Sequence, residues 1–315
     1  MHISEDTLDD LMHGILSCFL ASTTKQKVSS SRGNSWEIDG VLLELTNPLY
    51  RLSRTDRKSV FFSCLGELIW YLSGNNAPEQ ITYYIPKYKN EIEEDGTING
   101  AYGPRIYNLR GINQFDNVIE LLKRKPQSRR AVIQLFLAED LITDYKDIPC
   151  TCNIQFLIRE EKLNMYVQMR SNDVFVGLPH DVFAFTMIQE ILAKKLGKKL
   201  GVYKHYTTSL HLYETDEDKA KQFLDEGFQD KIAMPEMPIK NIDSSIKFLI
   251  DYEGKIREND DINLDNLEYD SYWLDLVKLL LILKKIKVNK LRDVVTIKNS
   301  MRYDIYETYI RKRTT

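Results

Sequence analysis

Hydrophobic and polar positions along this chain predict helices and strands in an order that does not alternate regularly. Apolar residues at helical spacing predict helices over residues 5–22, 59–72, 114–125 and 182–196. β-rich patterns predict strands over residues 131–137, 153–159 and 163–169, and segment 25–47 is typical of a loop that feeds strands. Glu160-Glu161 predicts a hairpin turn between the last two strands. This order favours an α+β fold over a doubly wound nucleotide fold, and neither G-x-G-x-x-G nor a P-loop sequence occurs.

The character of the chain changes after Asp216. The sequence MPEMP at 234–238 marks a turn or an extended stretch, and residues 257–269 are acidic and poor in apolar side chains. Residues 271–309 then carry Leu, Ile and Val at helical spacing. We therefore expect a body of residues 1–256, followed by a linker and a helical C-terminal extension over 257–315. Packing on the body, extension of a dimer and docking of another protein all suit this extension, and packing is the simplest interpretation.

Composition favours one large body and excludes several classes of function. The chain has 315 residues, of which 43% are hydrophobic, and it can bury a sizeable core. The formal net charge is -3, so we expect no direct nucleic-acid binding and only a small nucleotide as ligand. Lysines interrupt the apolar run at 274–286, and acids stand near the start where a secretory signal would be basic. These features predict a cytoplasmic protein without a membrane span.

Candidate chemistry concentrates between Ile148 and Asp181, where a thiol, a guanidinium, amides and carboxylates surround the predicted hairpin. The four cysteines show no metal-type spacing beyond one C-x-C, so we expect reduced thiols and no metal site. Cys152 is expected to be structural. Cys150, taken alone, would most often be an inert buried thiol.

Several motifs around this segment stand in a fixed order. Pro149-Cys150 is followed five residues on by Gln155, then by R-S-N-D at 170–173 and G-L-P at 177–179. Outside the segment the chain carries E-L-I-W at 67–70, Y-G at 102–103, S-R-R at 128–130 and H-L-Y at 211–213. Together these motifs resemble those of the thymidylate synthase superfamily over roughly residues 31–213. The resemblance implies a thymidylate synthase-like fold, with a large mixed sheet flanked by helices and residues 1–256 as the catalytic domain.

The resemblance implies that Cys150 is the nucleophile of a one-carbon transfer to a pyrimidine nucleotide. Pyrimidine C5 is a poor nucleophile until a thiolate adds to C6. Arg170 would favour the thiolate and would also contact the nucleotide phosphate. Glu67 would organise water and move protons at the base, and Tyr102 belongs to the same catalytic set. The co-substrate implied is 5,10-methylenetetrahydrofolate, and no metal is implied.

The resemblance also implies which residues bind the nucleotide and the folate. Arg32, Arg170 and Ser171 would hold the phosphate within one subunit, because guanidinium groups suit a dianionic phosphate. Arg129 and Arg130 would reach across a two-fold interface, which implies an obligate homodimer. His211 and Tyr213 would hold the sugar 3'-hydroxyl. Further substrate contacts are expected from Gln155, Asn172 and Asp173, and folate contacts from Asp173, Tyr88, Gly177 and His180.

Asp181 departs from the family pattern, because the uracil-specific enzymes have asparagine at this point. Cytosine offers an amino donor and an N3 acceptor, and an aspartate accepts from the amino group and, when protonated, donates to N3. Thr151 and Ser209 replace the usual histidine and aspartate, and Tyr88 and Glu91 stand near the positions of two tryptophans. With these replacements the motifs resemble those of the phage deoxycytidylate hydroxymethylases.

We therefore predict a hydroxymethyltransferase that acts on dCMP or CMP and forms 5-hydroxymethyl-(d)CMP after water adds. The chain ends RYDIYETYIRKRTT, unlike the thymidylate synthase segment that closes over the folate, and this difference would ease water entry. One alternative is a thymidylate synthase that methylates dUMP, or a cytidylate, and releases dihydrofolate. Another is a catalytically idle nucleotide-binding module. The motifs leave the choice between ribose and deoxyribose open.

Overall fold

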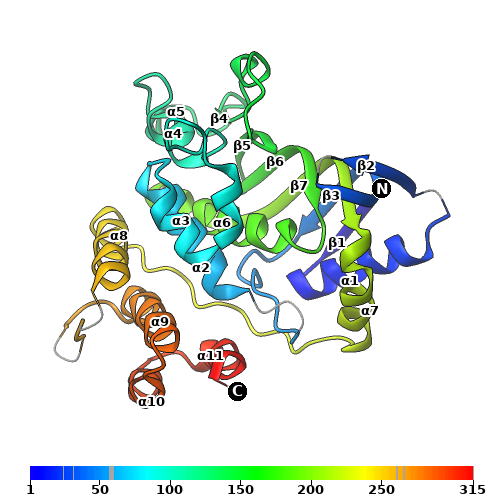
Figure 1. The fold of residues 1–315 in the computed structure, drawn as a ribbon. Helices are drawn as coiled ribbons and strands as arrows, with labels where there is room; N and C mark the ends of the chain where they lie inside the picture. Colours follow the sequence, from blue (N-terminus) through cyan, green and yellow to red (C-terminus); the bar gives the residue numbers. More distant parts are fainter. Residues whose placement is uncertain (24, 31, 57–59, 260–261, 265–266, 315) are drawn as a thin grey trace.

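The fold is a mixed β-sheet flanked by helices, as expected from the sequence (Figure 1). The structure is a computed structural model that describes residues 1–23, 25–30, 32–56, 60–259, 262–264 and 267–314. Its strands are β1 (His2–Glu5), β2 (Gln26–Ser30), β3 (Gly33–Leu45), β4 (Val132–Gln134), β5 (Thr151–Arg159), β6 (Lys162–Asp173) and β7 (Lys199–Tyr213). They form one sheet in the order β1-β3-β7-β6-β5-β4, with β2 also paired to β3. The β1/β3 and β6/β7 pairs are parallel and the others antiparallel.

Two buried helices support the centre of this sheet. Helix α6 (Gly177–Lys195) contacts β6 and β7, and α2 (Phe61–Ser73) packs on α6. Both are apolar around almost their whole circumference, as helices covered on every side must be. Helix α2 ends at Gly74, whose φ of 72° is a left-handed conformation that glycine adopts without strain. The predictions of these two helices are confirmed.

The remaining helices surround this centre. They are α1 (Leu8–Ala21), α3 (Pro78–Tyr84), α4 (Tyr102–Tyr107), α5 (Gln114–Arg124), α7 (Glu217–Asp225), α8 (Ile242–Glu258), α9 (Ser271–Lys287), α10 (Leu291–Asn299) and α11 (Glu307–Thr314). Short 3-10 helices include η1 (Pro86–Glu91), η2 (Ala138–Leu141), η3 (Glu214–Asp216) and η4 (Asp304–Tyr306). The sequence patterns did not predict α3, α7 or α8.

Some predicted boundaries shift where tertiary pairing prevails over local pattern. The predicted helix at 5–22 begins three residues later, because residues 2–5 pair with β3 and Thr7 caps α1. The first part of the predicted loop at 25–47 is strand β2, paired with β3. The hairpin at Glu160-Glu161 is confirmed, and both residues have the positive φ that a tight two-residue turn requires. Residue 59 of the predicted helix 59–72 lies outside the described residues.

The C-terminal helices pack on the body of the protein. Figure 1 shows α9, α10 and α11, coloured orange to red, gathered beneath α2 and α8. The rings of Tyr306 and Tyr309 lie 5.2 and 5.3 Å from the ring of Phe61 at the start of α2. Lys312 donates from Nζ to the backbone oxygens of residues 54 and 55. The division at residue 256 stays a proposal, since α8 runs across it and packs on α9.

Candidate active site

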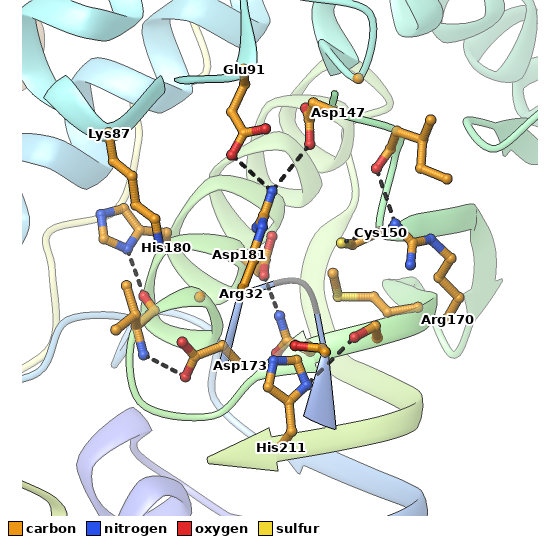
Figure 2. Close-up of a pocket in the computed structure, with 18 of the residues that line it drawn as sticks. Arg32, Lys87, Glu91, Asp147, Cys150, Arg170, Asp173, His180, Asp181 and His211 are labelled. Atoms are coloured by element: carbon orange, nitrogen blue, oxygen red, sulfur yellow. Dashed lines mark hydrogen bonds and ion pairs between the residues drawn. The ribbon is translucent and has the colours of Figure 1, made fainter. Parts of the chain in front are cut away.

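A single pocket collects most of the residues that the sequence motifs singled out. It has a volume of about 470 Å³ and lies where the ends of β6 and β7 meet the start of α6 (Figure 2). The predicted residues that line it are Arg32, Glu67, Tyr88, Tyr102, Cys150, Arg170, Ser171, Asn172, Asp173, Gly177, His180, Asp181, His211 and Tyr213. A cavity of this size is typical of a small-molecule site.

Three predicted residues lie outside this pocket. Arg129 and Arg130 are exposed on the turn before β4, and Gln155 donates from its side chain to the Arg129 carbonyl oxygen at 2.7 Å. The proposed substrate contact of Gln155 is therefore not formed within this chain. The role of the two arginines across a dimer interface remains a proposal, because it concerns a second subunit.

The Cys150 thiol stands at the entrance to β5 beside a guanidinium group. Arg170 Nη2 lies 3.6 Å from Cys150 Sγ, and the same side chain donates to the carbonyl oxygens of Pro149 and Ile148 at 3.0 and 3.2 Å. Burial raises the pKa of the Cys150 thiol, and the positive charge of Arg170 opposes that rise. The guanidinium is therefore placed to stabilise a thiolate at Cys150.

Two carboxyl groups and an amide meet at the inner end of the pocket. Asn172 donates from Nδ2 to Asp181 Oδ2 at 2.7 Å, and Tyr88 donates to Glu67 Oε1 at 2.9 Å. Burial raises the pKa of Asp181 well above its ordinary value, and the nearby Glu67 carboxylate raises it further. Both effects favour the protonated form of Asp181, in which the carboxyl group offers both a donor and an acceptor. Tyr102 fixes the start of β5, since its hydroxyl accepts the backbone N–H of Thr151 at 3.1 Å.

The parallel pairing of β6 with β7 assembles the polar end of the pocket. The register places Ser171 opposite Ser209 and Asp173 opposite His211. Ser171 Oγ lies 3.4 Å from His211 Nδ1, and burial lowers the pKa of His211, which favours the neutral imidazole. This pair offers short-range donors and acceptors of the kind that bind a sugar hydroxyl.

The turn into α6 is organised by Asp173. Its Oδ1 accepts the backbone N–H groups of Phe175 and Val176 at 2.8 and 3.0 Å. His180, one turn into α6, is held between the Val176 carbonyl oxygen at 3.0 Å and the Ser63 hydroxyl at 2.9 Å. Backbone and side chain thus fix the groups on this wall before any ligand binds.

The sequence motifs missed Asp147, which forms an acidic pair with Glu91 on the opposite wall. Arg32 Nη2 lies 2.9 Å from Glu91 Oε1 and 3.8 Å from Asp147 Oδ1, as the dashed lines in Figure 2 show. Burial raises the pKa of Asp147 to about 6, and the Glu91 carboxylate adds to the rise. Lys87 also lines this wall. The position of Asp147, three residues before Cys150, was the one signal in the sequence that could have identified it.

Comparisons with known proteins agree with this geometry. A family model described as thymidylate synthase matches residues 44–272. A deoxyuridylate hydroxymethyltransferase of Delftia phage PhiW-14 is 32% identical over 65% of this chain and 60% of its own length. Thymidylate synthase 1 of Bacillus spizizenii is 29% identical over 59% of this chain and 72% of its own length. The solved thermostable thymidylate synthase A from Bacillus subtilis has the same fold, with a TM-score of 0.59, 23% identity, and coverage of 72% and 86%.

These findings place the chain in a family whose named members include thymidylate synthases and a deoxyuridylate hydroxymethyltransferase. The protein belongs to the thymidylate synthase family. It spans about 60% of the length of the phage hydroxymethyltransferase that it resembles. In the described ranges no group of three or more His, Cys, Asp or Glu residues is arranged to hold a metal ion. Nor does any helix of the described part of the chain have the length and apolar character needed to cross a membrane.

Proposed function

We propose that this protein transfers a one-carbon unit from 5,10-methylenetetrahydrofolate to C5 of dCMP or CMP, and that water completes a 5-hydroxymethyl product. The observation that carries the proposal is Asp181 at the inner end of the pocket, where burial raises its pKa well above the ordinary value and so favours the protonated carboxyl group. The deoxyuridylate hydroxymethyltransferase relative supports the hydroxymethyl product, although its name specifies a uracil substrate. Hydroxymethylation of dUMP is therefore the second candidate.

Asp181 favours cytosine because of the way Asn172 holds it. The amide of Asn172 donates to Oδ2, which makes Oδ2 the oxygen without the proton and leaves Oδ1 to carry it. Oδ1–H then donates to the cytosine N3 acceptor, and Oδ2 accepts from the exocyclic amino group. Uracil would place its N3–H against the Oδ1–H donor. A buried mismatch of this kind costs about 1 to 3 kcal/mol.

The pocket also supplies the groups that the transfer needs. Cys150 adds to C6, and the electron pair displaced toward C5 makes that carbon nucleophilic. Arg170, at 3.6 Å from the sulfur, stabilises the thiolate as the proton leaves. Glu67, held by the Tyr88 hydroxyl, is placed beside Asp181 to move protons at the base.

The wall around Asp173 suits a flat ring with a polar edge. Asp173 uses Oδ1 for backbone groups, which leaves Oδ2 to accept from the amino edge of a pterin. Gly177 presents no side chain there, and the rings of Tyr88 and Trp70 meet edge to face at 5.6 Å on the facing side. His180 completes this group. Methylenetetrahydrofolate bound here would supply carbon at the oxidation level of formaldehyde.

The proposed homodimer can be tested through its shared sites. If Arg129 and Arg130 bind phosphate in the partner's pocket, an Arg130→Ala dimer and a Cys150→Ala dimer are each inactive for different reasons. Mixed dimers would contain one pocket that has both groups, so mixing the two proteins should restore part of the activity. If mass measurement verifies that mixed dimers have formed and they recover no activity, the shared site is contradicted.

The first experiment compares nucleotide substrates directly. Purified protein is incubated with methylenetetrahydrofolate and dCMP, CMP or dUMP in turn, with products read by mass and dihydrofolate by absorbance. We expect a hydroxymethyl cytidylate and no dihydrofolate. Cys150→Ala should abolish turnover, whereas Cys152→Ala, the matched neighbouring thiol, should not. Methylated product with dihydrofolate would instead support a methylating synthase, and binding without turnover would support an idle nucleotide-binding module.

A further inference from the structure

We infer that Asp147 is the general base that takes the proton from the water completing the hydroxymethyl product. The inference rests on the proposed function and adds a catalytic residue to it. Asp147 lines the same pocket as Cys150 and lies three residues before it in the chain (Figure 2). Its side chain is 21% exposed, so it has access to the pocket while most of its surface is covered.

The protein leaves a specific space for this carboxylate. A Cβ atom at Gly100 would lie 2.1 Å from Asp147 Oδ2 and 2.7 Å from its Cγ, so only glycine permits this placement. Asn99 donates from its side chain to the Asp147 carbonyl oxygen at 3.3 Å and so fixes the backbone. The carboxylate is therefore held by the fold in one position against the pocket.

The carboxylate also keeps its capacity to accept hydrogen bonds. Arg32 bonds to Glu91 at 2.9 Å, and its distance to Asp147 is 3.8 Å, too long for a hydrogen bond. Among the described residues, no side chain or backbone group donates to either oxygen of Asp147. A water molecule in the pocket is the natural donor to these lone pairs.

Charged groups around Asp147 set its basicity. The Glu91 carboxylate faces it from η1 and raises the pKa, as burial does, while Arg32, Arg170 and Arg105 lower it. The result, about 6, gives a base that is ionised at neutral pH and yet strong enough to accept a proton. Loss of the Arg32 charge to a bound phosphate would make Asp147 more basic still.

The step balances with groups already in the pocket. The Cys150 adduct carries the transferred carbon between C5 and the folate; once the C5 proton is lost and the carbon–nitrogen bond to the folate breaks, tetrahydrofolate leaves and an exocyclic methylene remains on C5. Water oxygen bonds to this methylene carbon, its proton passes to Asp147, and the π electrons move into the ring. The C6–S bond then breaks, the thiolate leaves, and the C5–C6 double bond returns. No oxidant or reductant is needed, in agreement with a reaction that forms no dihydrofolate.

The test uses one labelled substrate to measure two steps separately: loss of the C5 proton and addition of water. A cytidylate labelled with tritium at C5 releases tritium when the C5 proton is lost, before water adds. In a single turnover with enzyme in excess, Asp147→Asn should release tritium at close to the wild-type rate, while formation of the hydroxymethyl product slows by about 10²- to 10⁴-fold. Nucleotide should accumulate on Cys150, as seen in the mass of the denatured protein. Asp144→Asn, an exposed carboxylate on the same segment, is the matched control.

The pH profile and a second variant give independent readouts. Wild-type product formation should rise with an apparent pKa near 6, and Asp147→Asn should lose that limb. Gly100→Ala, which keeps the carboxylate but displaces it, should also lower product relative to tritium release. If the wild type is active and Asp147→Asn forms product at the same rate with the same pH profile, the assignment of Asp147 is overturned and the proposed function is not. Wild-type protein that releases no tritium would overturn the proposed function and this assignment with it.

Discussion

Replacement of Asp181 by asparagine should move the proposed base preference of this protein from cytosine toward uracil. Uracil needs an acceptor opposite its N3–H and a donor opposite O4, so the new amide must place nitrogen where Oδ2 now lies. That nitrogen would face Asn172 Nδ2, which now donates to Oδ2 at 2.7 Å. Asn172 can resolve the conflict by turning its amide, because its own Oδ1 is buried without a hydrogen-bond partner among the described residues.

The expected change in substrate preference has two parts, because the substitution removes the hydrogen-bond mismatch with uracil and creates one with cytosine. Each buried mismatch costs about 1 to 3 kcal/mol, so the ratio of the two substrates changes by about 2 to 6 kcal/mol, or roughly 30-fold to 10⁴-fold. The measurement is kcat/KM for dCMP and dUMP in Asp181→Asn and wild type. Asn172→Asp added to Asp181→Asn should keep the gain for dUMP, because a carboxylate at position 172 accepts from the new amide nitrogen without any turn.

Folding of the variant provides the control. Because the folded-state pKa of Asp181 is raised, its protonated form favours folding, and that contribution is lost as pH rises from the ordinary range through the raised value. Asparagine stays neutral, so stability of Asp181→Asn at neutral pH should not fall below wild type. An intact variant that keeps the wild-type preference for cytidylate would refute the proposed recognition.

Three further predictions concern other parts of the structure. Arg170→Ala should raise the pKa of the Cys150 thiol further and shift alkylation of that residue by iodoacetamide to higher pH, as followed by peptide mass. Glu190→Gln should leave Arg51 buried without its 2.6 Å ion pair and lower the free energy of unfolding by about 3 to 5 kcal/mol in urea titrations. Gly66→Ala should cost about 1 to 3 kcal/mol in the same assay, because its Cβ would lie 2.1 Å from a tyrosine ring.

The sequence predicted those elements whose pattern of hydrophobic residues fits only one kind of secondary structure. Helices α2 and α6 are continuous apolar segments, and the hairpin at Glu160-Glu161 lies between two β-rich stretches. Helix α8 was missed because charged residues interrupt its apolar positions, and its buried side depends on packing against α9 and α2. Boundaries failed for β1 and β2 because pairing with β3 decides them, across about forty residues for β1 and across a much shorter stretch of chain for β2.

The sequence predicted the site residues that belong to a motif. It did not predict a residue whose role depends only on the space around its side chain. Cys150 and Asp181 stand in motifs, and both line the pocket. Asp147 has no motif of its own, and its role depends on the space that Gly100 leaves. Arg129 and Arg130 stand in a motif yet lie outside the pocket, and their proposed role concerns a second subunit.

Strands β3 and β7 are far apart in the sequence, and their pairing also determines when the protein becomes able to bind its ligand during folding. Strand β3 pairs with β7 so that Ser35 lies opposite Tyr213, and both residues line the pocket. Contacts between segments so distant in sequence close large loops and form slowly. The pocket therefore exists only after this long loop has closed. Nucleotide binding should be among the last properties regained on refolding, which makes a nucleotide a sensitive probe of the finished native state.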